Sequence, residues 1–184
     1  MESVTDLLGR IHAGEQVAKE RLVECLYSEL RTRAEATMRN ERAWHTLQPT
    51  ALVHEALVRL YESSAFENAA DRRYLFAAAT RAMRRVLVDH ARMRKAEKRG
   101  GGMTKVPIDF AIASVEARQI DVLDLDAALK RLGELSPRQE QVIELRFFGG
   151  LSVPEVAQQL GRGLSTIEAD LKAAKAFLYG QLTA

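Results

Sequence analysis

The sequence predicts an all-α protein made of two small helical domains joined by a flexible linker. Apolar residues recur at helical spacing along most of the 184 residues, and no stretch alternates long enough to predict a strand. Aromatic residues make up 6% and charged residues 28%, which suits a helical protein. Three consecutive glycines and a proline in KRGGGMTKVP interrupt the helical pattern. We therefore predict one domain over residues 1–98, a linker over 99–122 and a second domain over 123–184.

The first domain is predicted to contain four helices. They cover Ser3 to Ala13, Gln16 to about Arg39, Pro49 to Glu62, and Asp71 to about Lys98. Periodicity places apolar side chains on the inner sides of the last three helices. These are Val17, Leu22, Leu26 and Leu30; Leu52, Val53, Ala56, Leu57 and Leu60; and Leu75, Ala79, Ala82, Val86 and Leu87.

The second domain is predicted to be a compact unit of three short helices, with helical periodicity resuming near Asp121. Three pairs have the spacing of capping boxes: Ser136 with Gln139, Ser152 with Glu155, and Ser165 with Glu168. Pro137 suits a first helical position, and Gly149-Gly150 and Gly161 suit helix ends. The helix after Pro137 is predicted to bury Val142, Ile143, Leu145 and Phe148.

Charge is distributed unevenly between the two domains. Residues 71–99 carry ten bases and three acids, whereas residues 123–184 carry seven bases and eight acids. A basic helix followed by a glycine-rich segment favours binding to nucleic-acid phosphates, and the alternative is a solvated helix face. Tyr74 and Phe76, at the start of this helix, could stack on unpaired bases or belong to the core.

The remaining composition argues against several other classes of protein. Cys25 is the only cysteine and is predicted to pack in the core, so no disulfide framework or thiolate metal cluster is expected. His54-Glu55 is half of a zinc-protease motif, but Val58 stands where the second histidine belongs, and His90 lacks a third ligand. We therefore predict no enzyme activity, metal or cofactor. The absence of a long apolar run or a signal-peptide pattern predicts a cytoplasmic protein without a membrane partner.

Two segments resemble a known family of transcription factors. LSPRQEQVIELRFFGGLSVPEVAQQLG resembles the last domain of bacterial sigma factors of the sigma-70 class. LVHEALVRLY, followed by RRYLFAAATRAMRRVLVDHARMRK, resembles their second domain. The two-domain build without extra modules is similar to the extracytoplasmic-function (ECF) group. The resemblance covers almost the whole chain except the linker, and both halves in this order are strongly specific.

The resemblance implies a role in transcription initiation without enzymatic chemistry. Sigma factors bind core RNA polymerase and direct it to promoter DNA. Their second domain contacts the polymerase clamp, reads the −10 element and captures an unpaired base, while their last domain reads the −35 element. The linker threads toward the active-site channel of the polymerase. An anti-sigma factor is a further candidate partner.

Candidate DNA contacts follow from the basic helix and from residues 151–178, which have the pattern of a helix-turn-helix. They are Arg81, Arg84, Arg85, Arg92, Arg94 and Lys95 in the first domain, and Arg162, Ser165, Thr166, Lys172 and Lys175 in the second. Residues 66–68 could hold a flipped base, while Leu164, Ile167 and Leu171 are expected to pack. The second domain can be nearly neutral because the polymerase delivers it to DNA, so that effective concentration replaces intrinsic affinity. Glu168 is expected to act as the capping partner of Ser165, with base reading as the alternative, and the sequence offers no firm role for Asp170.

One segment departs from the family pattern. Sigma factors typically carry an acidic D-A-E-D cluster before the L-V-x-E segment, and those acids meet bases on the polymerase clamp. Here the matching residues are QPTA, so three carboxylates are missing while Glu55 remains. The candidate polymerase contacts are Gln48, Thr50, Ala51, Glu55 and Arg59.

Thr50 stands where a family carboxylate would be, in the first turn after Pro49. A phosphate on Thr50 would restore negative charge at a helix N-terminus, so we hypothesise that a Ser/Thr kinase switches on polymerase binding. Thr46 is a second candidate, and the alternative is that Thr50 is simply a first-turn residue. Two rival functions remain open at this point: a degenerate sigma-like binding protein and a stand-alone helix-turn-helix regulator.

Overall fold

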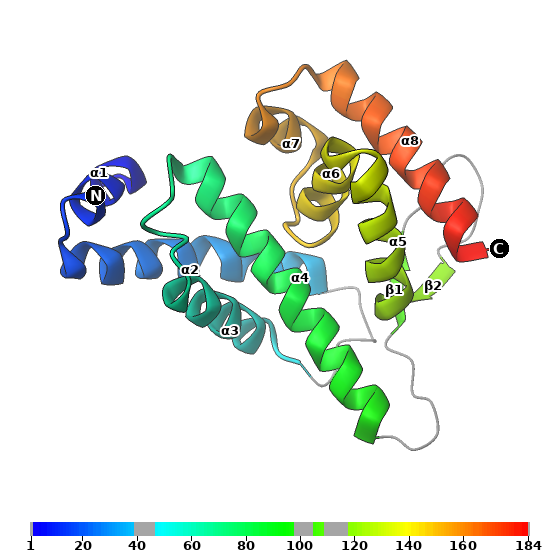
Figure 1. Ribbon diagram of the computed structural model, residues 1–184, viewed down its shortest axis with the longest axis horizontal. Helices are drawn as coiled ribbons and strands as arrows, with labels where there is room; N and C mark the ends of the chain where they lie inside the picture. Colours follow the sequence, from blue (N-terminus) through cyan, green and yellow to red (C-terminus); the bar gives the residue numbers. More distant parts are fainter. Residues whose placement is uncertain (1, 39–46, 98–104, 109–117, 184) are drawn as a thin grey trace.

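The protein is a helical molecule in which two groups of helices pack against each other (Figure 1). The structure is a computed structural model that describes residues 2–38, 47–97, 105–108 and 118–183. The N-terminal group contains α1 (Val4–His12), α2 (Gln16–Met38), α3 (Pro49–Glu62) and α4 (Arg72–Glu97). The C-terminal group contains α5 (Val122–Leu135), α6 (Pro137–Phe147), α7 (Val153–Leu160) and α8 (Leu164–Thr183). The predicted all-α class is therefore confirmed.

A short β-ribbon lies within the segment predicted as a linker. Strands β1 (Lys105–Ile108) and β2 (Arg118–Asp121) pair antiparallel, with Lys105 opposite Asp121 and Ile108 opposite Arg118. Each strand has only four residues, too few for an alternating pattern to stand out in the sequence. The ribbon leads directly into α5, whose N-cap residue Asp121 accepts a hydrogen bond from the Leu123 amide at 2.8 Å.

The N-terminal group forms because consecutive helices pack in pairs, α1 with α2, α2 with α3, and α3 with α4. A capping box between Ser3 and Asp6 starts α1. All the residues predicted to face inward from α3 and α4 are buried, as are Leu22, Leu26 and Leu30 of α2. These last three continue a buried stripe that begins at Ala18, which is fully buried.

Two predictions for α2 are wrong for the same reason. Val17 is 53% exposed, and Cys25 is also exposed. The buried stripe repeats every four residues through Ala18, Leu22 and Leu26, and each of the two exposed residues precedes a stripe residue by one position. One position rotates a side chain by about 100° around the helix, so Val17 and Cys25 point away from the core.

The C-terminal group has four helices, where the sequence predicted three. The additional helix is α5, which packs against α6 and α8 through its apolar face. The predicted burial of Val142, Ile143, Leu145 and Phe148 is confirmed. Gly161 ends α7 with φ +60°, a left-handed conformation that glycine adopts without steric cost.

The three predicted capping boxes have different outcomes. Ser152 and Glu155 form one: the Ser152 amide donates to Glu155 Oε2 at 2.7 Å, and the Glu155 amide donates to Ser152 Oγ. Ser136 is the N-cap of α6, but its side chain makes no capping hydrogen bond. Helix α8 begins at Leu164, so Ser165 lies inside the first turn and cannot cap it. Those two capping predictions are wrong because the boundaries and the cap geometry depend on how the preceding turn enters the helix.

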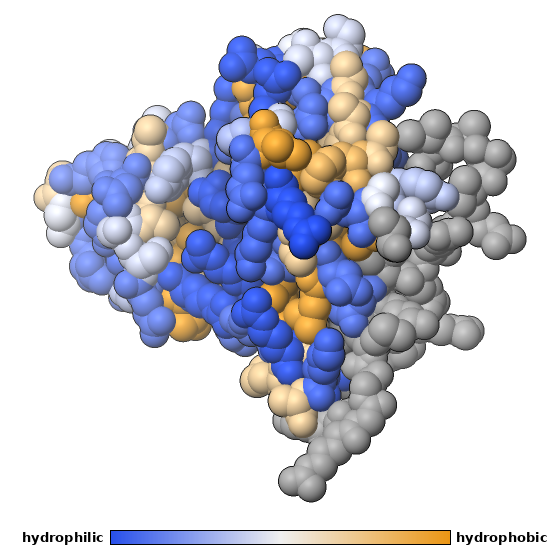
Figure 2. All heavy atoms as spheres, turned by 45° about the vertical axis from the view of Figure 1, so that its right-hand side comes forward, coloured by the Kyte–Doolittle hydropathy of each residue, from blue (hydrophilic) through white to orange (hydrophobic). Residues whose placement is uncertain are grey.

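The two groups meet along one side of α4, which packs against α5 and α6. The buried apolar side chains of both groups form one continuous cluster. On the face shown in Figure 2, hydrophilic side chains cover much of the coloured surface, with smaller hydrophobic patches between them. Among the described residues, no helix is both long and apolar enough to cross a membrane.

Candidate functional site

Helix α4 presents a row of basic side chains. Arg85, Arg92 and Lys95 are exposed, while Arg81 and Arg94 are half-buried. Arg92 lies 3.4 Å from Asp89, and within the described residues the other four make no ion pair. The four side chains without an ion pair can therefore meet phosphates, as the predicted role in DNA binding requires.

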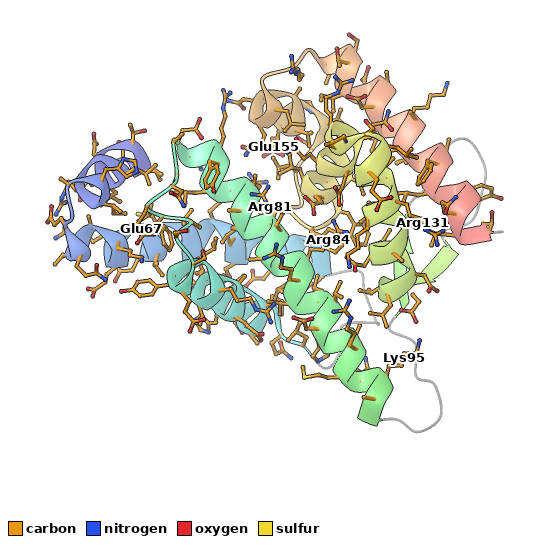
Figure 3. All side chains as sticks on the ribbon, in the orientation of Figure 1. Glu67, Arg81, Arg84, Lys95, Arg131 and Glu155 are labelled. Atoms are coloured by element: carbon orange, nitrogen blue, oxygen red, sulfur yellow. The ribbon has the colours of Figure 1, made fainter. Side chains whose placement is uncertain are left out.

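Arg84 differs from the other predicted DNA contacts because it is only 6% exposed. Its guanidinium is enclosed by carboxylates of the C-terminal group: Nε donates to Asp126 at 3.0 Å, and Nη1 donates to Glu140 at 2.8 Å and to Glu144 at 2.6 Å. Figure 3 shows Arg84 on the side of α4 that faces α5 and α6. In this conformation Arg84 is held by acids and is not presented to solvent.

The pKa values of two carboxylates beside Arg84 are shifted in opposite directions. Burial raises the pKa of Glu144 in spite of the hydrogen bond from Arg84. Burial also acts to raise the pKa of Asp126, but the hydrogen bond from Lys130 and the charge of Arg84 outweigh it and lower that pKa. Three carboxylates share one guanidinium here, and Lys130 adds a second cation at 2.8 Å from Asp126.

The loop between α3 and α4 contains the residues predicted to hold a flipped base, and the structure corrects part of that prediction. Phe66 is fully buried and packs edge-on against Tyr61, so it belongs to the core and cannot stack on a base. Glu67 is held by Lys19 at 2.8 Å. Asn68 is exposed, and its amide donates to Ser64 Oγ at 2.9 Å. Of the three predicted residues, Phe66 is therefore excluded, while Glu67 and Asn68 both remain exposed to a ligand.

A cavity of about 260 Å³ lies beside Asn68. Tyr74, Arg81 and Arg85 of α4 line its other side. Tyr74 is 39% exposed, whereas Phe76 is 4% exposed and belongs to the core. The sequence alone could not distinguish these two aromatic residues. In the structure, Tyr74 is the one of the two that is available for stacking.

The predicted DNA contacts of the helix-turn-helix lie at the turn before α8 and along that helix. Arg162, Ser165 and Lys172 are exposed, and Thr166 and Lys175 are half-buried. The packing predictions hold for Ile167, which is fully buried, and for Leu171, which is partly buried, but Leu164 is 47% exposed at the first position of α8.

The structure explains both acids of α8. Asp170 is 5% exposed and accepts two hydrogen bonds from Arg138 of α6, at 2.6 and 3.0 Å. It is therefore a structural partner that ties α8 to α6 and does not face DNA. Glu168 is exposed. Because Ser165 does not cap α8, the favourable interaction left for Glu168 is with the positive N-terminal end of that helix.

The N-terminus of α3 holds the segment that lacks the family's acids. Gln48 is the N-cap residue and makes no side-chain capping hydrogen bond, Pro49 occupies the first turn, and this turn contains no acid. Thr50 is half-buried and Ala51 is exposed. Thr46, the other candidate for phosphorylation, lies outside the described residues.

Further along α3, two predicted polymerase contacts pair with each other. Arg59 donates to Glu55 at 2.7 Å and to Asp89 of α4 at 2.9 Å. Because Arg59 bridges both carboxylates, Glu55 does not stand as an isolated negative charge on this surface.

Sequence reasoning missed an apolar groove between α2 and α3. It has a volume of about 460 Å³, and its lining includes Tyr27, His54, Val58 and Tyr61. Val58 is 52% exposed and Tyr61 is 38% exposed, while Tyr27 stacks on His54 with ring centroids 5.0 Å apart. The available signal was that positions 54, 58 and 61 repeat at helical spacing outside the predicted inward stripe of α3.

The described residues contain no group of three or more histidine, cysteine, aspartate or glutamate side chains arranged to hold a metal ion. His54 lines the apolar groove, and Glu55 forms an ion pair with Arg59.

Comparison with known proteins identifies the family. A search of curated proteins finds no match. The sequence model of the ECF sigma factor family, by contrast, matches residues 1–184. This match spans both helical groups, which carry a basic helix and a helix-turn-helix. The protein therefore belongs to the ECF sigma factor family, whose members are sigma-70-class factors of transcription initiation.

Proposed function

We propose that this ECF sigma factor directs core RNA polymerase to specific promoters, and that phosphorylation of Thr50 by a Ser/Thr kinase controls its binding to the polymerase. Membership of the family implies core RNA polymerase and promoter DNA as partners. The control by phosphorylation is specific to this chain, and it is supported by the N-terminus of α3.

The observation that carries the proposal is an uncapped, acid-free first turn with a threonine in it. Helix α3 starts without a side-chain cap and without a carboxylate in its first turn. The amides of a helix N-terminus and its positive dipole end favour anions. A phosphate on Thr50 would place a charge of about −1.5 to −2 there, in the position where the family's acids meet the clamp.

The surface next to Thr50 has the composition of a protein interface. The groove that contains Val58 and Tyr61 exposes apolar side chains along α3, and exposed apolar patches with polar surroundings mark protein-binding surfaces. Glu55 and Arg59 lie on the same helix. We therefore assign this face of α3 to the polymerase, with apolar contacts supplying area and the Thr50 phosphate supplying the missing charge.

DNA binding is assigned to the two remaining surfaces. Residues 1–98 would read the −10 element through the basic row on α4 and the cavity beside Asn68. Residues 123–184 would read the −35 element through the exposed start of α8, with Arg162 and Lys172 binding phosphates. Replacing one phosphate-binding side chain by alanine should reduce the slope of the logarithm of the DNA-binding constant against the logarithm of the salt concentration by about one.

The experiment compares binding to purified core RNA polymerase of the unmodified protein, the protein with phosphothreonine at position 50, and a matched control. The control carries phosphothreonine at Thr5, an exposed residue in the first turn of α1. We expect phosphorylation at Thr50 to tighten binding at least tenfold and phosphorylation at Thr5 to change it less than twofold. Thr50→Ala should bind as the unmodified protein does and should resist activation by a kinase.

The other outcomes identify what is wrong with the proposal. Equally tight binding by all forms would keep the sigma function and remove the switch. If no form binds, the protein is a degenerate sigma-like partner-binding protein that starts no transcription.

A further inference from the structure

The contact between the two helical groups is built around a buried, charged residue of the DNA-binding helix. Among the described residues, the Arg84 guanidinium donates its hydrogen bonds to the C-terminal group: to the side chain and main chain of Asp126 on α5 and to Glu140 and Glu144 on α6. We name these four residues the Arg84 cluster. Arg84, Asp126 and Glu144 are almost fully buried, whereas Glu140 is half-buried, so the cluster lies largely inside the contact between the groups.

The same side of α4 carries neighbouring bases into the contact region. A cavity of about 420 Å³ is lined by Arg81, Arg85 and Arg92 of α4 together with the acids of the Arg84 cluster. A carboxylate is a planar anion whose oxygens accept hydrogen bonds from a guanidinium, as phosphate oxygens do. The acids of α5 and α6 therefore occupy the place that a DNA phosphate would take on this part of α4.

A second set of contacts joins the groups at the other end of α4. Arg33 of α2 donates to Glu155 of α7 at 3.1 Å, and Gln159 of α7 donates to the Arg73 carbonyl oxygen at 2.7 Å. Between the two ends, Gly149 lies so close to α4 that an added Cβ would be 3.1 Å from Thr80 Oγ1. The contact thus runs along α4 from Arg73 to Arg84.

A closed molecule of this kind cannot read both promoter elements at once. The −10 and −35 elements are about 25 base pairs apart, which corresponds to about 85 Å of duplex. A compact chain of this length is about 40 Å across. Residues 98–122 would span about 80 Å if fully extended, so the covalent connection permits the groups to separate once both the contact along α4 and the pairing of β1 with β2 break.

We propose that the contact of α4 with α5 and α6, centred on the Arg84 cluster, is an autoinhibitory latch. In the closed form, it withholds Arg84 from DNA and keeps the two recognition surfaces too close together for a promoter. Opening exposes Arg84 for phosphate binding. This inference rests on the proposed function, because the two groups are assumed to read separate elements.

The first test measures the distance between the groups. A spectroscopic label on the native Cys25, exposed on α2, is paired with a second label at Ala176→Cys, on α8. The latch variant is Asp126→Asn with Glu144→Gln, which keeps side-chain shape and removes two charges. The matched control is Asp124→Asn with Glu134→Gln, which removes two charges from exposed positions of α5. We expect a longer and broader distance distribution in the latch variant and an unchanged one in the control.

The second test measures affinity for a duplex of arbitrary sequence at low salt, without polymerase. The latch variant should bind at least tenfold tighter than the unaltered protein, and the control should stay within threefold, since both carry the same change in net charge. Arg33→Gln, which leaves the Arg84 cluster intact, should give a smaller shift in both measurements. It therefore serves as the second variant if the double substitution impairs folding, a condition that circular dichroism reveals.

Unchanged distances in the latch variant and in Arg33→Gln, or equal DNA affinity of the latch variant and its control, would overturn the latch. Neither measurement involves Thr50 or polymerase. An open latch variant combined with a failure of phosphorylated protein to bind polymerase would refute the proposed function and leave the latch in place.

Discussion

Replacing Phe66 tests whether the loop after α3 is held by the core. Phe66 is fully buried, its ring packs edge-on on Tyr61 with centroids 6.5 Å apart, and Lys19 Nζ lies 5.6 Å from the ring centroid. Phe66→Ala removes the whole ring from a site that the surrounding helices keep open. For a fully buried ring this should lower the free energy of unfolding by about 4 kcal/mol. Phe66→Leu, which refills most of the volume, should cost about 1 kcal/mol.

The assay is equilibrium unfolding in urea, followed by far-ultraviolet circular dichroism, with Asn68→Ala as a control in the same loop. Asn68 is exposed and its side chain donates one hydrogen bond, to Ser64, so its removal should cost less than about 1 kcal/mol. If Asn68 contacts a base, Asn68→Ala should still change base preference in promoter binding. A cost below about 1 kcal/mol for Phe66→Ala, or equal costs for the two alanine variants, would refute the assignment of Phe66 to the core.

Further predictions concern the caps, a turn, one carboxylate and the basic helix. Ser152→Ala should lower the free energy of unfolding by about 1 kcal/mol in urea titrations, and Ser136→Ala should have almost no effect, because Ser152 makes capping hydrogen bonds and the Ser136 side chain does not. Gly161→Ala should cost about 1 kcal/mol in the same assay because of its positive φ, and a neutral result would contradict the left-handed turn. The pKa of Glu155 is lowered from 4.5 to about 2, first by hydrogen bonds from Ser152 and then by Arg33. A depressed folded-state pKa gives stability that is present above 4.5 and disappears as the pH falls toward 2. The difference in urea midpoint between the unaltered protein and Glu155→Gln should therefore shrink across that window, and a constant difference would argue against the assigned hydrogen bonds. Lys95→Ala should weaken DNA binding similarly for all sequences and reduce the salt slope by about one, and a weakening confined to one sequence would indicate base reading.

Most helices could be predicted from the sequence because their signals are local. The buried stripes of α3 and α4 follow helical spacing, Pro49 and Pro137 mark helix starts, and Gly161 marks a helix end. The incorrect predictions occur where the outcome depends on a neighbouring element. Val17 lies one position away from the buried stripe of α2, and Leu164 is the first residue of α8, where a side chain can point past the edge of the packed neighbour.

The sequence predicted the residue composition of the candidate site better than it predicted how those residues are arranged in space. The basic character of α4 and the acid-free start of α3 are properties of the residues, and the structure retains both. The apolar groove was missed because it needs residues from two helices, α2 and α3, which are brought together by packing. The role of Phe66 was misjudged because a loop carries no periodicity from which its burial could be inferred.

The helical class, the family resemblance, the uneven charge and the missing acids before α3 follow from the amino-acid sequence, since each depends on residue identity and short-range spacing. Which charged side chains remain available to a partner depends instead on how the helices pack. In the chain, Arg84 and Asp170 resemble the charged residues around them, yet Arg84 is buried by acids 42 to 60 residues away, and Asp170 is held by Arg138, 32 residues away. A buried charge must find a partner wherever the fold provides one, and no local pattern in a sequence reports the distance between residues so far apart.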